Sequence, residues 1–298
     1  MIFTYNFFRS GVLTQMNQNK TPRASKGFTL IELLVVMGII ALLLAILLPA
    51  LNKARATTRR VKDQTQIQQI HKGFLTLAID RNGLFLTPGL VNRFGTVPGR
   101  GAEDQTKNDH GALYSACIMD NAFDAQVLVS PSEVSTNVLA MANYNFQSKN
   151  VAQDIWWDPN LRADLTALSN VSYGTHLLGG SRKTKEWRDT KNSRYAVLGN
   201  RGVQNGDLTD AIYNASRTLG IHGNDKSWEG GIVYNDNHVM YEEGFTPIDH
   251  QKARVNNVNV DDNIFKADEG DTGADAFLTV CKTVTGGGTS YTYNITWD

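Results

Sequence analysis

Six histidines are the residues of this 298-residue chain best suited to bind a metal or move a proton. The densest grouping of candidate ligands is His222, Asp225, Asp236 and His238. A zinc protease needs two histidines four residues apart on one helix, and a structural zinc site needs a close pair of cysteines. The sequence has neither spacing, and it lacks a Gly-x-Ser-x-Gly elbow and a phosphate-binding glycine loop. We therefore expect the chain not to be an enzyme.

A run of carboxylates near the carboxy terminus offers a different metal chemistry. Its members are Asp261, Asp262, Asp268, Glu269, Asp271 and Asp275. Calcium prefers hard oxygen ligands of this kind, which leads to the hypothesis of a calcium site at Asp268, Asp271 and Asp275. The spacing does not fit an EF-hand, so an acidic loop that is simply solvated is the competing interpretation. We expect no cofactor to be required.

The apolar run from Phe28 to Leu48 contains a single charged residue, Glu32. Its 21 residues are enough, at a rise of about 1.5 Å each, to cross a hydrocarbon layer of about 30 Å. A secretory signal peptide is the alternative, but the run is too long and a poor cleavage site follows it. Basic residues flank the run on both sides, so the positive-inside rule does not orient it. Because a carboxylate in hydrocarbon costs several kcal/mol unless it is neutralised or paired, Glu32 is a functional candidate.

Residues 26 to 32 read Lys-Gly-Phe-Thr-Leu-Ile-Glu and resemble the processing site of the type IV pilin and type II secretion pseudopilin family. The resemblance implies that prepilin peptidase cuts between Gly27 and Phe28 on the cytoplasmic side and methylates the new amino terminus. Glycine suits this position because a residue without Cβ lets the peptide lie close to the peptidase. The family also implies that Glu32 pairs with the amino terminus of a neighbouring subunit. The competing interpretation is a carboxylate that reaches the membrane interface or stays protonated.

The resemblance extends to two features of the carboxy-terminal part. The stretch from His222 to Val239 is similar to a motif of large pilin-like proteins from planctomycete-type bacteria, a histidine followed after nine residues by Asp-Gly. In this sequence the interval from His222 to Asp236 is longer, and Asn237 replaces the glycine. Some pseudopilins hold calcium in a carboxy-terminal loop, which the resemblance implies for the acidic run as well.

Helical spacing continues beyond the apolar run. Pro49 removes one helix hydrogen bond, so we expect it to kink the helix rather than end it. An apolar face then recurs at intervals of three and four residues, at Ile67, Ile70, Phe74 and Leu77. We expect this helix to run to about Asp80, to stop at Asn82-Gly83 and to bury its apolar face against the globular part. The basic run from 53 to 62 has three interpretations: attraction to anionic lipid head groups, pairing with acidic groups of the next subunit, or solvation.

After Gly83 the pattern becomes strand-like and rich in loops. Residues 109–120 predict a helix capped by Asp109, and residues 133–141 predict another. Two hairpins are predicted: strands at 231–234 and 238–241 flank Asn235-Asp236-Asn237, and strands at 277–284 and 289–297 flank Gly286-Gly287-Gly288. A long helix packed on an antiparallel sheet is the expected assembly.

Charge and cysteine content narrow the class of protein further. From Asp63 onward the chain has 20 basic and 28 acidic residues, a net of about −8, which argues against nucleic-acid binding. This balance also disfavours a DNA-uptake minor pilin, which needs a basic face. The two cysteines, Cys117 and Cys281, either form one disulfide across a long loop or are two buried thiols.

These observations predict an α+β chain with a pilin-like organisation. Residues 1–27 are a cytoplasmic leader peptide, residues 28–48 a transmembrane helix, residues 49–82 the extracytoplasmic amphipathic part of the same helix, and residues 83–298 a globular head. We expect a structural subunit of a type II secretion pseudopilus or a type IV pilus-like filament, with a single pass through the inner membrane. Its expected partners are prepilin peptidase, other pilin or pseudopilin subunits and an inner-membrane assembly platform. The alternative is a membrane-anchored extracytoplasmic enzyme or binding protein, which would gain nothing from Glu32.

Overall fold

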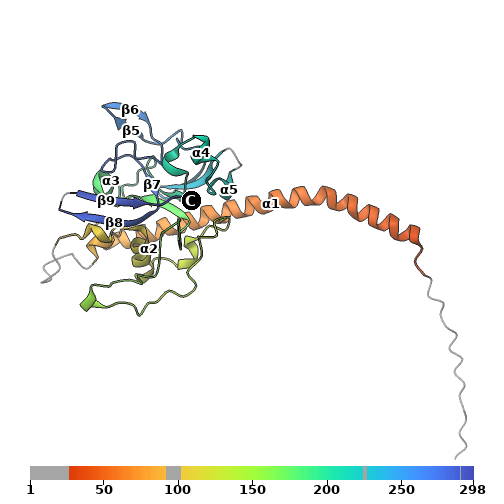
Figure 1. Cartoon of the computed structure of the whole chain (residues 1–298), viewed down its shortest axis with the longest axis horizontal. Coiled ribbons are helices and arrows are strands. Elements are labelled where there is room, and N and C mark those ends of the chain that lie inside the picture. The colour runs from red at the N-terminus through yellow and green to blue at the C-terminus, as the bar shows by residue number, and fades with distance from the viewer. Residues whose placement is uncertain (1–26, 92–101, 224–226, 289) are drawn as a thin grey trace, which may run out of the picture. The chain divides into compact units, whose positions relative to one another are not determined.

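The computed structural model describes residues 27–91, 102–223, 227–288 and 290–298 (Figure 1). Within it the chain divides into one unit that ends at Asn52 and a second, compact unit from Lys53 to Asp298. A long apolar helix precedes a mixed domain with an antiparallel sheet, so the predicted α+β class is confirmed.

Helix α1 runs from Leu30 to Ile79 and contains Pro49 without ending there. It ends as predicted, because Asn82 and Gly83 adopt positive φ angles of 53° and 79° and Gly83 N donates to Ala78 O at 2.9 Å. In the amino-terminal unit every large apolar side chain of residues 28–51 is at least 45% exposed. The helix is long and apolar enough to cross a membrane, which would cover these side chains.

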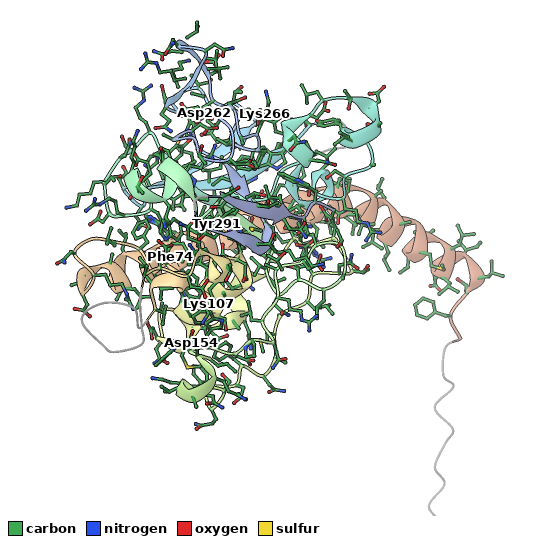
Figure 2. All side chains as sticks on the ribbon, turned by 60° about the vertical axis from the view of Figure 1, so that its left-hand side comes forward. Phe74, Lys107, Asp154, Asp262, Lys266 and Tyr291 are labelled. Atoms are coloured by element: carbon green, nitrogen blue, oxygen red, sulfur yellow. The ribbon has the colours of Figure 1, made fainter. Side chains whose placement is uncertain are left out.

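In the second unit α1 buries one face in the hydrophobic core. Ile67, Ile70 and Phe74, the last of which is labelled in Figure 2, have no exposed surface, as the apolar spacing predicted. Gly73 lies on the same face, and the Phe123 ring packs against it. A Cβ at residue 73 would come within 2.5 Å of that ring, so there is no room for a larger residue without movement. Polar Asp63 and His71 are also fully buried on the same face, which the sequence did not predict.

The described part of the second unit contains a five-stranded antiparallel sheet in the order β4-β3-β2-β1-β7. Its strands are β1 (Tyr173–His176), β2 (Ala196–Asn200), β3 (Glu229–Tyr234), β4 (Val239–Glu243) and β7 (Leu278–Thr279). β1 and β2 are buried along their whole length. The first predicted hairpin is confirmed as β3 and β4, and the turn residue Asn237 has a φ of 71°.

Two further hairpins and several short helices complete the head. The hairpins pair β5 (Lys252–Val255) with β6 (Val258–Asp261), and β8 (Cys281–Gly287) with β9 (Ser290–Ile295). The short helices are α2 (His110–Met119), α3 (Gly180–Lys185), α4 (Asp210–Tyr213) and α5 (Leu219–His222), with 3-10 turns η1 (Pro88–Leu90), η2 (Gln105–Lys107), η3 (Ala125–Leu128), η4 (Val151–Gln153) and η5 (Gln204–Gly206). The predicted cap of α2 is confirmed, since the Asp109 side chain accepts from Ala112 N at 2.8 Å.

Two predictions about the head need correction. The second predicted hairpin exists, but β8 starts only at Cys281, because residues 278–279 form the separate strand β7 beside β1. The predicted helix at 133–141 is wrong. Its backbone pairs with another segment, since Leu139 N donates to Ser169 O and Ser169 N donates to Asn137 O, both at 2.9 Å.

Candidate functional site

The residues of the predicted processing site precede α1. Gly27 and Phe28 lie outside the helix, and the Phe28 side chain is 78% exposed. A Cβ added to Gly27 would meet no atom within 4 Å. The fold of the described chain therefore does not require glycine at this position.

Glu32 helps to cap the amino-terminal end of α1. Its Oε2 accepts from Thr29 N at 2.9 Å and from Thr29 Oγ1 at 2.8 Å. Glu32 N donates in return to Thr29 Oγ1 at 3.2 Å. This reciprocal arrangement over three residues is a capping box, which satisfies donors that a helix start leaves unpaired. The described residues provide Oε1 with no hydrogen bond, so Oε1 can accept from a group outside the chain.

A buried polar cluster joins α1 to the sheet at Asp63. The Asp63 carboxylate accepts from Tyr173 Oη at 2.5 Å, from Asn200 Nδ2 at 2.7 Å and from His222 Nε2 at 2.6 Å. A carboxylate only accepts, so His222 carries its proton on Nε2. Asn200 Oδ1 in turn accepts from Gly231 N at 2.7 Å, which extends the cluster to β3. Burial and the neighbouring Asp63 raise the pKa of Tyr173 well above its usual value.

Two contacts flank this cluster along the helix. On one side Arg60 pairs with Glu229 at 3.2 Å and lies over the Tyr241 ring, 3.6 Å from its centroid. On the other side buried His71 contacts Asn237 Oδ1 through Nδ1 at 3.1 Å. Burial lowers the pKa of His71 to about 4, so His71 is neutral near pH 7. Arg60 therefore contacts β3 and β4, and His71 contacts the turn that joins them.

The histidines considered as metal ligands have separate partners. His222 binds Asp63, whereas His238 Nδ1 contacts Asp236 Oδ1 at 2.5 Å. Asp225 lies outside the described residues. Over the described ranges, no group of three or more His, Cys, Asp or Glu residues is placed to hold a metal ion.

The acidic run also has partners within the chain. Asp275 forms a fully buried ion pair with Arg182 of α3, and Arg182 Nη1 donates to the backbone oxygen of Asp271 at 3.1 Å. Asp268 pairs with Lys266 at 3.0 Å. The calcium hypothesis for Asp268, Asp271 and Asp275 stays a prediction.

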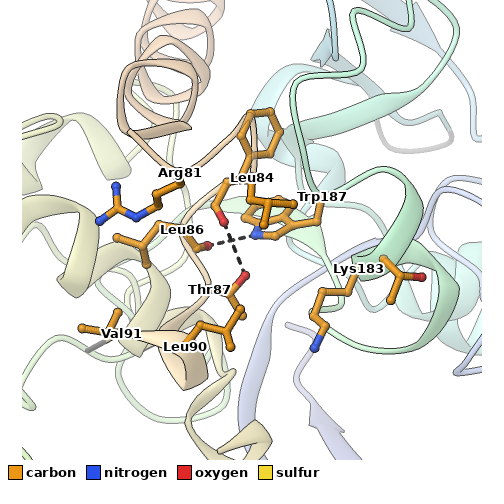
Figure 3. A pocket seen from close by; sticks show the side chains of 10 residues that line it. Arg81, Leu84, Leu86, Thr87, Leu90, Val91, Lys183 and Trp187 are labelled. Atoms are coloured by element: carbon orange, nitrogen blue, oxygen red, sulfur yellow. Dashed lines mark hydrogen bonds between the residues drawn. The ribbon is translucent and has the colours of Figure 1, made fainter. Parts of the chain in front are cut away.

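An apolar pocket of about 310 Å³ lies between the end of α1 and α3 (Figure 3). Trp187 forms one wall and donates from Nε1 to Leu86 O at 2.9 Å. The two cations at the pocket already have partners, because Lys183 pairs with Glu103 at 2.5 Å and Arg81 pairs with Asp120 at 2.9 Å. The pocket therefore offers apolar surface rather than an acid, a base or a nucleophile.

Cys117 and Cys281 are both free and buried. Of the two arrangements considered for them, the structure contains the buried thiols rather than the disulfide. Burial raises the pKa of both thiols, to about 12 for Cys281. Neither thiol is therefore activated as a nucleophile.

Comparison with known proteins identifies the amino-terminal segment. Residues 22–48 match the prokaryotic N-terminal methylation motif, so the chain carries a signature of the type IV pilin and pseudopilin kind. No curated protein and no solved structure matches the chain. The motif indicates a pilin-type substrate of prepilin peptidase, and the match includes Gly27, Phe28 and Glu32.

The Asp63 cluster is the part of the site that sequence analysis missed. A signal was present, because Asp63 precedes the apolar residues 67, 70 and 74 at helical spacing and therefore lies on the buried stripe. A carboxylate at such a position needs buried donors. The donors could not be identified from sequence, since Asn200 and His222 are 137 and 159 residues away along the chain.

Proposed function

We propose that this chain is a prepilin-like structural subunit. Prepilin peptidase cleaves the bond between Gly27 and Phe28 at the cytoplasmic face of the inner membrane and methylates Phe28. The mature chain keeps its apolar helix in the membrane and its head outside the cytoplasm. An inner-membrane platform then assembles it with other subunits into a type II secretion pseudopilus or a type IV pilus-like filament.

The observation that carries the proposal is the glycine that the fold does not need. A Cβ at residue 27 would meet nothing within 4 Å, yet glycine stands there beside Phe28 within the matched motif. A peptidase that grips the extended peptide supplies the missing reason, because a Cβ would hinder close approach. Glu32 supports the same proposal, since the capping box leaves Oε1 able to accept from the amino terminus of a neighbouring subunit.

Processing is tested by intact mass and amino-terminal sequencing of the protein from membranes of its native host. We expect a chain that starts at N-methylated Phe28. A chain that keeps residues 1–27, or one cut after Pro49, would contradict the proposal. It would favour the alternative of an anchored extracytoplasmic protein.

Assembly is tested with three variants that separate the two tasks of Glu32. Glu32→Ala removes the cap and the charge, Glu32→Gln keeps an acceptor for the cap but removes the charge, and Thr29→Ala weakens the cap but keeps the charge. We expect both Glu32 variants to be processed and inserted but to abolish filaments, as measured in sheared surface or periplasmic fractions. Thr29→Ala should assemble within about twofold of the parent, because a cap contributes only about 1 kcal/mol.

Two outcomes would count against the assembly role of Glu32. If Glu32→Ala assembles normally, the helix is only an anchor. If Thr29→Ala fails as completely as Glu32→Ala while Glu32→Gln assembles, the cap rather than a charge pair between subunits is what assembly requires.

A further inference from the structure

A pocket of about 370 Å³ lies where the second unit begins. It is lined by Lys53, Ala56, Thr57, Arg59 and Arg60 of α1, by Ile221 and His222 of α5, and by Ser132. No acidic residue is among these lining residues. The volume falls within the range of small-molecule sites, which is about 300–1,000 Å³. The pocket therefore combines room for a small ligand with a concentration of positive charge.

The charge in this pocket is largely uncompensated. The side chains of Lys53 and Arg59 form no ion pair with any other residue in the described ranges. Arg60 pairs with Glu229 and is held over the Tyr241 ring, so its position is fixed. The other nearby carboxylate, Asp63, already accepts three hydrogen bonds from Tyr173, Asn200 and His222. Two cations thus remain available to an anion.

We propose that this pocket binds the phosphate of an anionic phospholipid. Lys53 follows Leu48, the end of the apolar run, by only five residues. The phosphates of a bilayer lie just outside its hydrocarbon layer. Side chains on a helix lean toward its amino terminus, so Arg59 and Arg60 lean along α1 toward the side from which the lipid approaches. This inference depends on the membrane anchor and not on assembly into a filament.

The structure supplies a matched control within the same basic run. Arg55 and Lys62 are exposed cations of α1 that do not line the pocket. At about 100° per residue they lie on the side of the helix opposite Lys53 and Arg60, and Arg59, which also lines the pocket, lies between the two sides. A double variant Lys53→Gln/Arg59→Gln therefore removes the same charge as Arg55→Gln/Lys62→Gln but at a different place.

The test uses the full chain, delipidated in a non-ionic detergent, with isothermal titration of three probes: dihexanoyl phosphatidylglycerol, dihexanoyl phosphatidylcholine and inorganic phosphate. We expect phosphatidylglycerol to bind most tightly. Lys53→Gln/Arg59→Gln should weaken its binding about tenfold or more, because two charge-assisted contacts to the phosphate are lost. Arg55→Gln/Lys62→Gln should change it less than about twofold. Thermal unfolding of both variants should match the parent, since all four side chains are exposed.

Three outcomes would overturn the inference. Equal weakening by both double variants would mean diffuse attraction to the whole basic run rather than a site. Inorganic phosphate binding as tightly as phosphatidylglycerol would mean a site for free phosphate and not for lipid. Absence of lipid binding, together with self-association that only Lys53→Gln/Arg59→Gln abolishes, would assign the pocket to carboxylates of a second copy of the chain.

Discussion

Replacement of Asp63 is the most informative perturbation of the contact between α1 and the sheet. Asp63 has no exposed surface and accepts hydrogen bonds from Tyr173, Asn200 and His222. Two variants separate shape from hydrogen bonding. Asp63→Ala removes all three acceptor contacts, whereas Asp63→Asn keeps the shape and one carbonyl oxygen.

The geometry sets the size of each effect. Asp63→Ala leaves the donors of Asn200 and His222 buried without a partner, at about 1–3 kcal/mol each. The unpaired Tyr173 hydroxyl costs less free energy, because it lies 3.2 Å from a second acceptor, Gln66 Oε1. We expect Asp63→Ala to lower the free energy of unfolding by about 3–5 kcal/mol. In Asp63→Asn the side-chain carbonyl oxygen still accepts hydrogen bonds from Asn200 and His222. The new amide group donates to the Tyr173 hydroxyl, which turns to donate to Gln66. The free energy of unfolding should therefore fall by only about 1–2 kcal/mol.

The assay is guanidinium unfolding of the full chain in detergent, followed by tryptophan fluorescence. Trp187 and Trp228 are buried and become exposed on unfolding. Asp80→Ala is the matched control, because Asp80 is an exposed carboxylate just beyond α1, and it should change stability by less than about 0.5 kcal/mol. The denaturant slope should stay constant across the series. Equal losses for Asp63→Ala and Asp63→Asn, or a loss below about 1 kcal/mol for Asp63→Ala, would refute the role assigned to the cluster.

Three further variants test other buried groups by the same unfolding assay. Burial lowers the pKa of His71 from 6.5 to about 4, so its contribution is complete above pH 6.5 and is lost as the pH falls toward 4. His71→Gln should therefore reduce the acid-induced loss of stability by up to about 3 kcal/mol at pH 4, and an unchanged pH profile would contradict this. Arg201→Met should cost about 3–5 kcal/mol, because it strands the buried carboxylates of Glu133 and Asp298. Gly73→Ala should cost about 1–3 kcal/mol through its clash with Phe123, and full stability there would mean that the ring moves aside at little cost.

The features that sequence predicted are those determined over a few residues. The apolar spacing of Ile67, Ile70 and Phe74 identified the buried face of α1, since a helix brings residues three and four apart to one side. The turn at Asn82-Gly83 and the cap at Asp109 depend equally on local backbone chemistry. The prediction of a helix at 133–141 was wrong because its backbone partner is not local. Its residues have helical spacing, but their backbone groups bond to Ser169, a partner that is distant in sequence.

In the candidate site, too, the contacts that sequence could not predict are those between residues far apart in the chain. His222 resembled a possible metal ligand in the sequence, yet the fold gives it a structural task, the hydrogen bond to Asp63 at 2.6 Å. Asp275, considered as a calcium ligand, is paired with Arg182 in the interior. In both cases the partner is far away in the sequence, so the residue type alone could not reveal the contact that the fold provides.

Gly27 is the opposite case, a residue that the sequence motif singles out but that the fold does not require. The fold gives full reasons for Asp63 and Gly73, because removing their chemistry or adding a methyl group disturbs named neighbours. It gives no reason for Gly27, whose surroundings would accept a Cβ, and only a partial reason for Glu32, which caps its helix through one of its two oxygens. Both residues lie within the matched motif, and for both we propose a partner outside the chain. Under the proposed function, that partner is the peptidase for Gly27 and the amino terminus of the next subunit for Oε1 of Glu32.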